Sequence, residues 1–213
     1  MDGTTVRHIN PHLLGILEKI DDVMFKTSAW FHRKNPHPDF YLHSTKKPRL
    51  LVQRALHTIR TKPVEQIVQP CPGIYTLLEL LKDSGIPMGI VSNGLGKGYG
   101  HDILTKFDLA HYFTAQIFRE DIERSKPHPD PILKALQNMD IPLTSQDVVW
   151  YIGDRYKDVI AALAANDIIS ASVVPFAYGV KSAVAILEKG LNPDQIIPSY
   201  TDFSARIYST VKP

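Results

Sequence analysis

Residues 148–158 read VVWYIGDRYKD. Five β-branched or aromatic residues in succession predict a buried strand over Val148–Ile152, and the pair Gly153-Asp154 marks its end. Ligands of open α/β sheets bind at the carboxyl ends of the strands, so Asp154 and Asp158 place two carboxylates at a binding edge. Oxygen ligands of this kind suit a hard cation such as Mg²⁺. The alternative interpretation is that Asp154 only caps the following helix.

A similar alternation of short apolar runs and amphipathic stretches extends from Pro70 to the end of the chain. Strands that alternate with helices favour βαβ units. We therefore expect an α/β fold with a doubly wound, mostly parallel, Rossmann-like sheet. The expected helices cover residues 74–84, 101–107, 131–139, 156–165, 182–189 and 203–208, and the expected strands cover residues 86–91, 115–118, 148–152, 168–174 and 195–197.

Residues 8–69 differ in composition from the rest of the chain. Lys and Arg outnumber Asp and Glu in this segment, which also holds six of the nine histidines. Asn10 is a suitable N-cap for an apolar helical pattern, residues 34–48 hold three prolines and indicate a loop, and a second helix is expected over residues 49–60. We therefore expect a core made of residues 1–7 and 70–213, with a small helical cap inserted over residues 8–69.

Composition excludes several classes of protein. The 213 residues carry a net charge of +2, too small an excess to indicate nucleic-acid binding. The single cysteine, Cys71, cannot form an internal disulfide, fits a reducing cytosol and is expected to be buried and inert. No apolar run of about 18 residues exists, so no membrane span is expected. We expect a cytoplasmic protein without nucleic-acid or membrane partners, and the sequence does not indicate its oligomeric state.

Ser92-Asn93-Gly94 follows the strand expected over residues 86–91. A hydroxyl and successive backbone N–H groups at a strand end can bind a phosphoryl oxygen, although the same residues are common in ordinary turns. Glycine then recurs at every second position up to Gly100. This spacing matches neither the dinucleotide fingerprint nor a phosphate-binding loop with Ser or Thr after Gly-Lys. The candidate phosphate contacts are therefore Ser92, Asn93 and Gly94, not a nucleotide loop.

Two further polar clusters complete the pattern. Lys126 precedes Pro127-His128-Pro129, a rigid turn that would fix the direction of its ammonium group. A lysine in a turn is more often simply solvated. The chain opens with Met1-Asp2-Gly3-Thr4, a cluster typical of a turn at the end of a strand, with no apolar strand before it.

Taken in order, the clusters at Asp2–Thr4, Ser92, Lys126 and Gly153-Asp154 resemble the four motifs of the haloacid dehalogenase (HAD) superfamily. The chain is similar to phosphoglycolate-phosphatase-type members of that superfamily with a helical cap. The resemblance implies phosphate-ester hydrolysis in which an aspartate carboxylate attacks phosphorus and water then hydrolyses the aspartyl-phosphate.

The resemblance also implies a role for the residues of the first and fourth motifs. Asp2 would be the general acid and base, and its backbone carbonyl would help to hold Mg²⁺. Thr4 would orient the loop that carries Asp2. Asp154 would bind Mg²⁺, and Asp158 would brace the site or share the metal.

The second and third motifs would contact the substrate. By the same resemblance, Ser92, together with Asn93 and Gly94, would bind the transferring phosphoryl group. Lys126 would offset the negative charge on the nucleophile and the phosphoryl oxygens.

The first motif departs from the superfamily pattern, Asp-x-Asp-x-Thr, in which the first Asp is the nucleophile. Aligned on Asp2 and Thr4, that nucleophile falls one position before Met1. The apolar strand that carries the motif at the centre of the sheet is also missing, which would leave two strands with unpaired N–H and C=O groups. We expect the natural polypeptide to start upstream, and we expect the present chain to be impaired as an enzyme.

The leading hypothesis is a Mg²⁺-dependent phosphatase that acts on a small phosphorylated metabolite. Lys46, Lys47, Arg49 and Arg54 in the expected cap are candidates for recognising the anionic substrate, with a solvated surface as the alternative. The competing hypotheses are a catalytically inactive phosphate-binding or regulatory protein, and a phosphomutase of the same superfamily.

Overall fold

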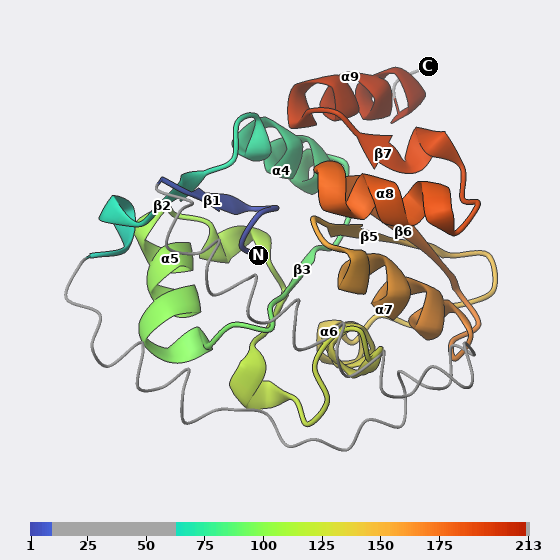
Figure 1. Ribbon diagram of the computed structural model, residues 1–213, viewed down its shortest axis with the longest axis horizontal. Helices are drawn as coiled ribbons and strands as arrows, with labels where there is room; N and C mark the ends of the chain where they lie inside the picture. The colour runs from blue at the N-terminus through green and yellow to red at the C-terminus, as the bar shows by residue number, and fades with distance from the viewer. Residues whose placement is uncertain (10–62, 212–213) are drawn as a thin grey trace.

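The computed structural model describes residues 1–9 and 63–211, and Figure 1 shows how their helices and strands are arranged. The cap expected over residues 8–69 lies almost entirely outside these ranges. The helices expected after Asn10 and over residues 49–60 therefore lie outside the described residues. The same is true of the candidate substrate-recognising residues Lys46, Lys47, Arg49 and Arg54.

Short parallel strands form the centre of the described structure. β3 (Gly89–Val91) pairs with β4 (Ala115–Ile117), β5 (Val148–Gly153) pairs with β6 (Ser172–Tyr178), and β6 pairs with β7 (Ile196–Ile197). Among the described residues no ladder joins β3 to β5, where the family resemblance places a central strand. The terminal ammonium of Met1 donates to the Val91 carbonyl at 3.4 Å, so Met1 lies at the carboxyl end of β3. The expected α/β class with mostly parallel strands is confirmed.

Helices pack on both sides of these strands. Figure 1 shows α4 next to α9 in the upper part of the view, while α7 and α8 pack on the β5–β6 pair and α6 packs on β3 and β4. Within residues 1–9 and 63–211, no helix is both long and apolar enough to cross a bilayer. The helices are α4 (Ile74–Asp83), α5 (His101–Lys106), α6 (Asp130–Met139), α7 (Tyr156–Asn166), α8 (Val180–Glu188) and α9 (Tyr200–Val211).

The β5–β6 pair contributes to two separate layers of core. Ile152 and Phe176 pack into the core that includes residues of α4, α5 and α9. Val149, Tyr151 and Val173 pack against α6 and α7. Because neighbouring residues of a strand point to opposite faces, alternate residues of each strand enter the two layers. The sheet is therefore covered on both faces, as a doubly wound fold requires.

Two expected strands were placed too early in the sequence. The strand expected over residues 168–174 is β6, which begins only at Ser172. Helix α7 ends at Asn166, Ile168 is exposed, and the Asn166 side chain accepts a hydrogen bond from the Val173 N–H at 2.9 Å. The strand expected from residue 86 likewise begins only at Gly89, because the Ile86 N–H still bonds back to the Leu81 carbonyl of α4.

An antiparallel ribbon that the sequence did not predict connects the core to the undescribed segment. β1 (Val6–His8) pairs with β2 (Val68–Pro70), with Val6 opposite Pro70 and His8 opposite Val68. The ribbon spans both boundaries of the expected cap, at residues 7/8 and 69/70. The Cys71 N–H donates to the Thr5 carbonyl at 3.0 Å, which continues the pairing toward Asp2.

Candidate active site

Four charged side chains that the sequence singled out surround one point at the carboxyl ends of β3 and β5. The amine of Met1 is buried at this point. Burial and the charge of Lys126 lower its pKa, while the carboxylates of Asp2, Asp154 and Asp158 act in the opposite direction. Direct contacts link these groups: Lys126 Nζ lies 2.7 Å from Asp158 Oδ1, and a Cβ on Gly3, next to Asp2, would lie 2.1 Å from Asp154 Oδ2. The structure therefore brings together residues from three distant segments of the chain.

The loop that carries Asp2 is a tight turn around the Met1 carbonyl. This oxygen accepts hydrogen bonds from the Thr4 and Thr5 N–H groups at 3.2 and 2.8 Å and from the Thr4 hydroxyl at 3.1 Å. Gly3 has φ +84°, and a Cβ there would lie 2.1 Å from a carboxylate oxygen of Asp154. Glycine is thus required at position 3 because Asp154 lies directly against its backbone.

Asp2 and Ser92 face the same small space. A Cβ placed on Gly94 would lie 3.3 Å from Ser92 Oγ and 3.9 Å from Asp2 Oδ2. The Ser92 side chain is buried, and its oxygen accepts the Gly94 N–H at 3.0 Å. A hydroxyl, a carboxylate oxygen and a glycine backbone therefore line one position at the end of β3.

Asn93 connects the second motif to the third. Its side-chain amide donates to the Lys126 carbonyl at 3.1 Å and accepts the Lys126 N–H at 3.1 Å. The two bonds fix the backbone that carries Lys126. The amide group of Asn93, which the sequence analysis considered as a substrate contact, is used in the structure to position Lys126.

Lys126 and Asp158 form a buried ion pair. Lys126 Nζ lies 2.7 Å from Asp158 Oδ1, with side chains 8% and 6% exposed, and 5.7 Å from the centre of the Tyr151 ring. Burial alone would lower the pKa of Lys126, but Asp158 raises it above the ordinary value. Burial would also raise the pKa of Asp158, but Lys126 lowers it below the usual range. Both groups are therefore charged at neutral pH.

The second Asp158 oxygen accepts the Arg155 N–H at 3.0 Å at the start of α7. Both oxygens of Asp158 are thus engaged by the protein, an arrangement suited to bracing the site. Asp154 differs, because burial and the neighbouring charge of Asp158 raise its pKa to about 6. Such a carboxylate gains stability from a nearby cation.

The donor set at this point suits Mg²⁺. The described residues hold no cluster of three His, Cys, Asp or Glu side chains that would form a complete metal cage. Mg²⁺, however, is commonly held by one or two carboxylates, with waters and substrate phosphate oxygens completing its shell. Asp154, the Asp2 loop and a bound phosphate would together provide that all-oxygen environment.

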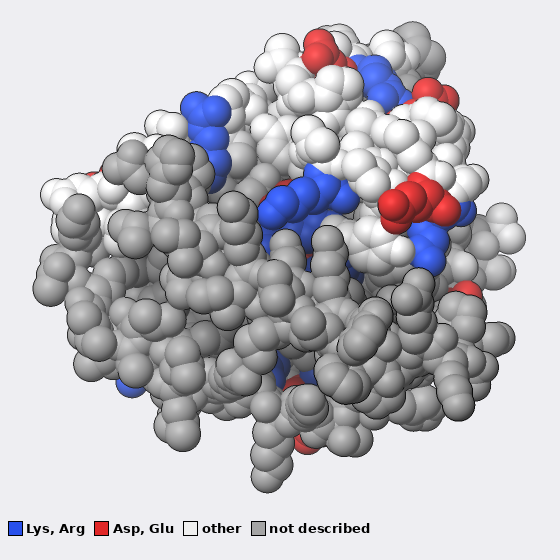
Figure 2. Space-filling model, in the orientation of Figure 1, with Lys and Arg blue, Asp and Glu red and all other residues white. Residues whose placement is uncertain are grey.

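Charge on the surface is mixed in sign. On the face drawn in Figure 2, basic side chains gather near the middle of the molecule with acidic atoms beside them. The described residues on this face therefore carry charges of both signs.

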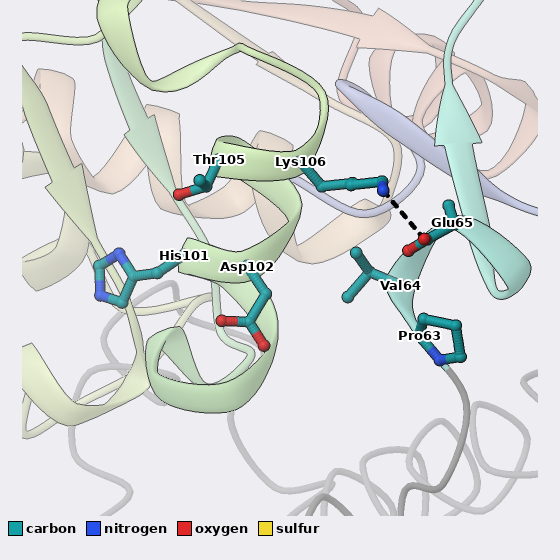
Figure 3. A pocket seen from close by; sticks show the side chains of 7 residues that line it. All are labelled: Pro63, Val64, Glu65, His101, Asp102, Thr105 and Lys106. Atoms are coloured by element: carbon teal, nitrogen blue, oxygen red, sulfur yellow. Dashed lines mark ion pairs between the residues drawn. The ribbon is translucent and has the colours of Figure 1, made fainter.

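A separate hollow of about 450 Å³ lies between the turn at residues 63–66 and α5. Figure 3 shows Lys106 of α5 and Glu65 pointing toward one another across it, and their ion pair measures 3.0 Å. His101, Asp102 and Thr105 extend from the same helix. None of the four motif clusters contributes to this hollow, so it is distinct from the site around Met1.

Cys71 is inert in the folded protein by its surroundings. The side chain is 3% exposed, and burial raises the pKa of its thiol to about 11. At pH 8 only about one thiol in a thousand would be ionised, and the thiolate is the reactive form. We expect iodoacetamide to leave the native protein unmodified at pH 8 and to label it after unfolding in urea, as measured by intact mass. Equal labelling rates in the two states would contradict this prediction.

Residues 25–171 match the family described as haloacid dehalogenase-like hydrolase, and this match covers more than half of the chain. The chain belongs to the haloacid dehalogenase-like hydrolases. The family resemblance inferred from the four motifs is confirmed.

Individual members of this hydrolase family match in part. Phosphoglycolate phosphatase of Escherichia coli is 33% identical over 95 residues, which are 45% of this chain and 36% of that protein. Pyrophosphatase PpaX of Oceanobacillus iheyensis is 27% identical over 158 residues, 74% of this chain and 68% of that protein. The chain thus spans well under half of the length of the phosphoglycolate phosphatase that it matches.

Solved structures agree on the fold. A HAD-superfamily hydrolase from Ehrlichia chaffeensis superposes with a TM-score of 0.54 at 23% sequence identity, covering 88% of this chain and 86% of that one. This likeness establishes the α/β architecture of the hydrolase family for the chain.

Tyr99 and His8 are polar residues of the site that the sequence analysis did not single out. The Tyr99 hydroxyl donates to Asp2 Oδ1 at 2.9 Å, and His8 Nε2 lies 3.7 Å from the same oxygen. Tyr99 occurs inside the glycine run, and this is the only sequence signal that could have drawn attention to it. Nothing local indicates His8, because its contact with Tyr99 joins residues 91 positions apart.

Proposed function

We propose that the protein hydrolyses the phosphate ester of a small phosphorylated metabolite with the aid of Mg²⁺. The observation that carries the proposal is the convergence of the four motif clusters. Gly3 of the Asp2 loop lies against Asp154, and Ser92 faces Asp2. Lys126 pairs with Asp158, on the helix that follows Asp154. The relatives named phosphoglycolate phosphatase and pyrophosphatase support the substrate class. The single buried Cys71 supports a cytoplasmic location.

Each residue has a task in this reaction. The Ser92 hydroxyl binds a phosphoryl oxygen, and Lys126 offsets the charge that develops on the phosphoryl group. By the family resemblance, the carboxylate of an aspartate other than Asp2 attacks phosphorus as the ester P–O bond breaks. Asp2 gives its proton to the leaving oxygen. Asp2 then takes a proton from the water that cleaves the aspartyl-phosphate. Mg²⁺ bound at Asp154 would neutralise charge on the phosphoryl oxygens.

A second candidate function is phosphate binding without turnover. Among the described carboxylates near Met1, Asp158 is paired with Lys126, and Asp154 packs against Gly3. Asp2 is held by Tyr99. The family resemblance gives each of the three another role: Asp2 that of general acid and base, Asp154 that of metal ligand and Asp158 that of a brace. Such a chain retains the groups that bind phosphate.

An assay of two forms of the protein separates these functions. The chain of residues 1–213 is compared with the same chain extended upstream through the expected strand and its Asp, with 4-nitrophenyl phosphate as substrate. We expect both forms to bind inorganic phosphate in Mg²⁺ by calorimetry, and only the extended form to turn over. Chelation of Mg²⁺ should abolish turnover.

Substitutions test the assigned roles in the extended form. We expect Asp2→Asn to lower kcat by about 10²–10⁴-fold on an alkyl phosphate, the usual contribution of a general acid or base. Ser92→Ala should weaken phosphate binding. Turnover by residues 1–213 alone would contradict the assignment of the nucleophile, and binding without turnover in both forms would favour the second function. Absence of phosphate binding in both forms would refute both.

A further inference from the structure

The glycine run at residues 94–100 has a structural cause that is unrelated to nucleotides. Gly96–Gly100 forms an irregular turn, in which Lys97 and Gly98 are not helical, and it packs closely against the ring of Phe118. A Cβ on Gly96 or Gly100 would lie 2.9 or 2.2 Å from ring atoms of Phe118, and Gly98 has φ +76°. Side chains are therefore excluded at two of these positions by contact with Phe118 and disfavoured at the third by backbone conformation.

Glu120 binds the backbone at the start of this turn. Its carboxylate accepts the Gly96 N–H at 3.1 and 2.9 Å and the Lys97 N–H at 3.1 Å. Burial tends to raise the pKa of Glu120, but these N–H groups lower it below its usual value. The carboxylate is therefore charged at neutral pH, as such a clamp requires.

The rigid turn presents Tyr99 to the active site. Tyr99 is 7% exposed, and its hydroxyl lies 2.9 Å from Asp2 Oδ1 and 3.2 Å from His8 Nε2. A phenol has one proton, and Tyr99 donates it to Asp2 Oδ1, an oxygen that accepts whether or not Oδ2 carries a proton. Nε2 of His8 must then carry the proton that it donates to the Tyr99 oxygen. The order of donation is thus His8 to Tyr99 to Asp2.

The two oxygens of Asp2 consequently differ. Oδ1 is held by Tyr99, whereas Oδ2 faces the space that it shares with Ser92 and Gly94. A general acid is effective only when its proton is directed at the leaving oxygen within hydrogen-bond reach. Anchoring one oxygen directs the other toward the position of the phosphoryl group.

We propose that Tyr99 and His8 are positioning residues that orient the Asp2 carboxylate. The glycine run, Phe118 and Glu120 in turn fix the position of Tyr99. The inference rests on the proposed function, because it assigns to Asp2 the proton transfer of that reaction. His8 lies on β1, the strand that leads into the undescribed segment from residue 10. The orientation of the Asp2 carboxylate therefore depends on both the glycine-rich turn and the ribbon.

The test compares leaving groups in the extended form of the protein. An alkyl phosphate needs its leaving oxygen protonated, whereas 4-nitrophenolate leaves without a proton. We expect Tyr99→Phe to lower kcat/KM for the alkyl phosphate about tenfold or more, a part of the general-acid effect, and to leave kcat/KM for 4-nitrophenyl phosphate within about threefold. The ratio kcat/KM is used because it reports the first phosphoryl transfer and not the later hydrolysis.

Tyr112→Phe is the matched control. Tyr112 is equally buried, and its hydroxyl also donates to a carboxylate, that of Glu79, remote from the motif clusters. This variant should leave the ratio of the two kcat/KM values unchanged. His8→Gln, whose amide can still donate to Tyr99, should retain more alkyl phosphatase activity than His8→Phe.

Each outcome decides a different claim. Equal losses on both substrates in Tyr99→Phe would show a general structural defect and overturn the inference, as would a control that behaves in the same way. If no phosphate ester is turned over by any form, the proposed function fails. The inference is then decided by crystal structures of wild type and Tyr99→Phe with inorganic phosphate and Mg²⁺. An unchanged Asp2 orientation in the variant would overturn it, and a rotated carboxylate would support it.

Discussion

Replacing Lys126 with Met is expected to lower the free energy of unfolding by about 3–5 kcal/mol, the usual cost of removing one partner of a buried ion pair. The substitution preserves much of the apolar stem but leaves Asp158 charged and buried without its cation. The loss should be measured by urea denaturation at pH 7, where both partners are charged in the wild type. Phosphate binding should be lost in the same variant, because Lys126 is the cation assigned to the phosphoryl group.

Lys106→Met is the matched control for this change. Lys106 pairs with Glu65 at 3.0 Å, close to the separation of the buried pair, but the two side chains are 51% and 39% exposed. Exposed ion pairs contribute little because water screens them. We expect almost no change in stability for this variant. Losses of similar size in the two variants would contradict the role given to burial.

The difference between wild type and Lys126→Met should depend on pH in a defined direction. The pKa of Asp158 is lowered in the folded wild type. Its contribution is therefore present above the unfolded-state pKa of about 4 and disappears as pH falls through the lower folded value. In the variant, protonation instead relieves an unpaired buried charge. The stability difference should shrink on acidification, and a difference that grows would show that the pair is not the cause.

Helices and strands could be predicted where nearby residues in the sequence mark their ends. The run of β-branched and aromatic residues before Gly153-Asp154 gave β5 to within one residue, and Gly85 follows α4 as expected. These signals depend on neighbours in sequence, namely side-chain periodicity and the conformations that glycine allows. The same signals located the clusters that meet around Met1.

The antiparallel ribbon could not be predicted in the same way. β1 and β2 have three residues each, too few to show an alternation, and their pairing joins residues on either side of the whole expected cap. β6 was misplaced because the apolar pair Ile168-Ile169 resembles the start of a strand. In the structure Ile168 is exposed in the turn after α7, and only Ile169 packs against the core.

The residues that hold the site side chains in position could not be predicted from the sequence either. The pattern identified Asp2, Ser92, Lys126 and Asp154 as candidates because each follows a strand or opens a turn. It did not show that Asn93 holds Lys126, or that Tyr99 holds Asp2. Such contacts depend on the distance between segments after folding, and glycine spacing alone does not reveal what the turn surrounds.

Gly3→Ala is expected to abolish phosphate binding and to lower the free energy of unfolding by more than Gly85→Ala does. The Cβ would lie 2.1 and 2.9 Å from the two Asp154 carboxylate oxygens, and the residue has φ +84°. The left-handed conformation alone costs about 1–2 kcal/mol for a residue with a side chain. Displacement of Asp154 adds to this cost, because its carboxylate lies directly against the Gly3 backbone and must move to admit the methyl group.

Gly85→Ala separates the two contributions. Gly85 has φ +67°, and nothing lies within 4 Å of the position that its Cβ would take. This control should therefore lose only the backbone cost of about 1–2 kcal/mol, and it should bind phosphate in Mg²⁺ like the wild type. Urea denaturation and calorimetry with inorganic phosphate measure the two effects.

Gly153→Ala provides the complementary case. Its Cβ would lie 2.2 Å from the Asp158 Cβ, and no left-handed conformation is involved. We expect this variant to resemble Gly3→Ala in losing both stability and phosphate binding, because it displaces the carboxylate that holds Lys126. If Gly3→Ala instead matched Gly85→Ala in stability and bound phosphate normally, Asp154 would not depend on the Gly3 backbone. The close packing of the first motif against the fourth would then not be required for phosphate binding.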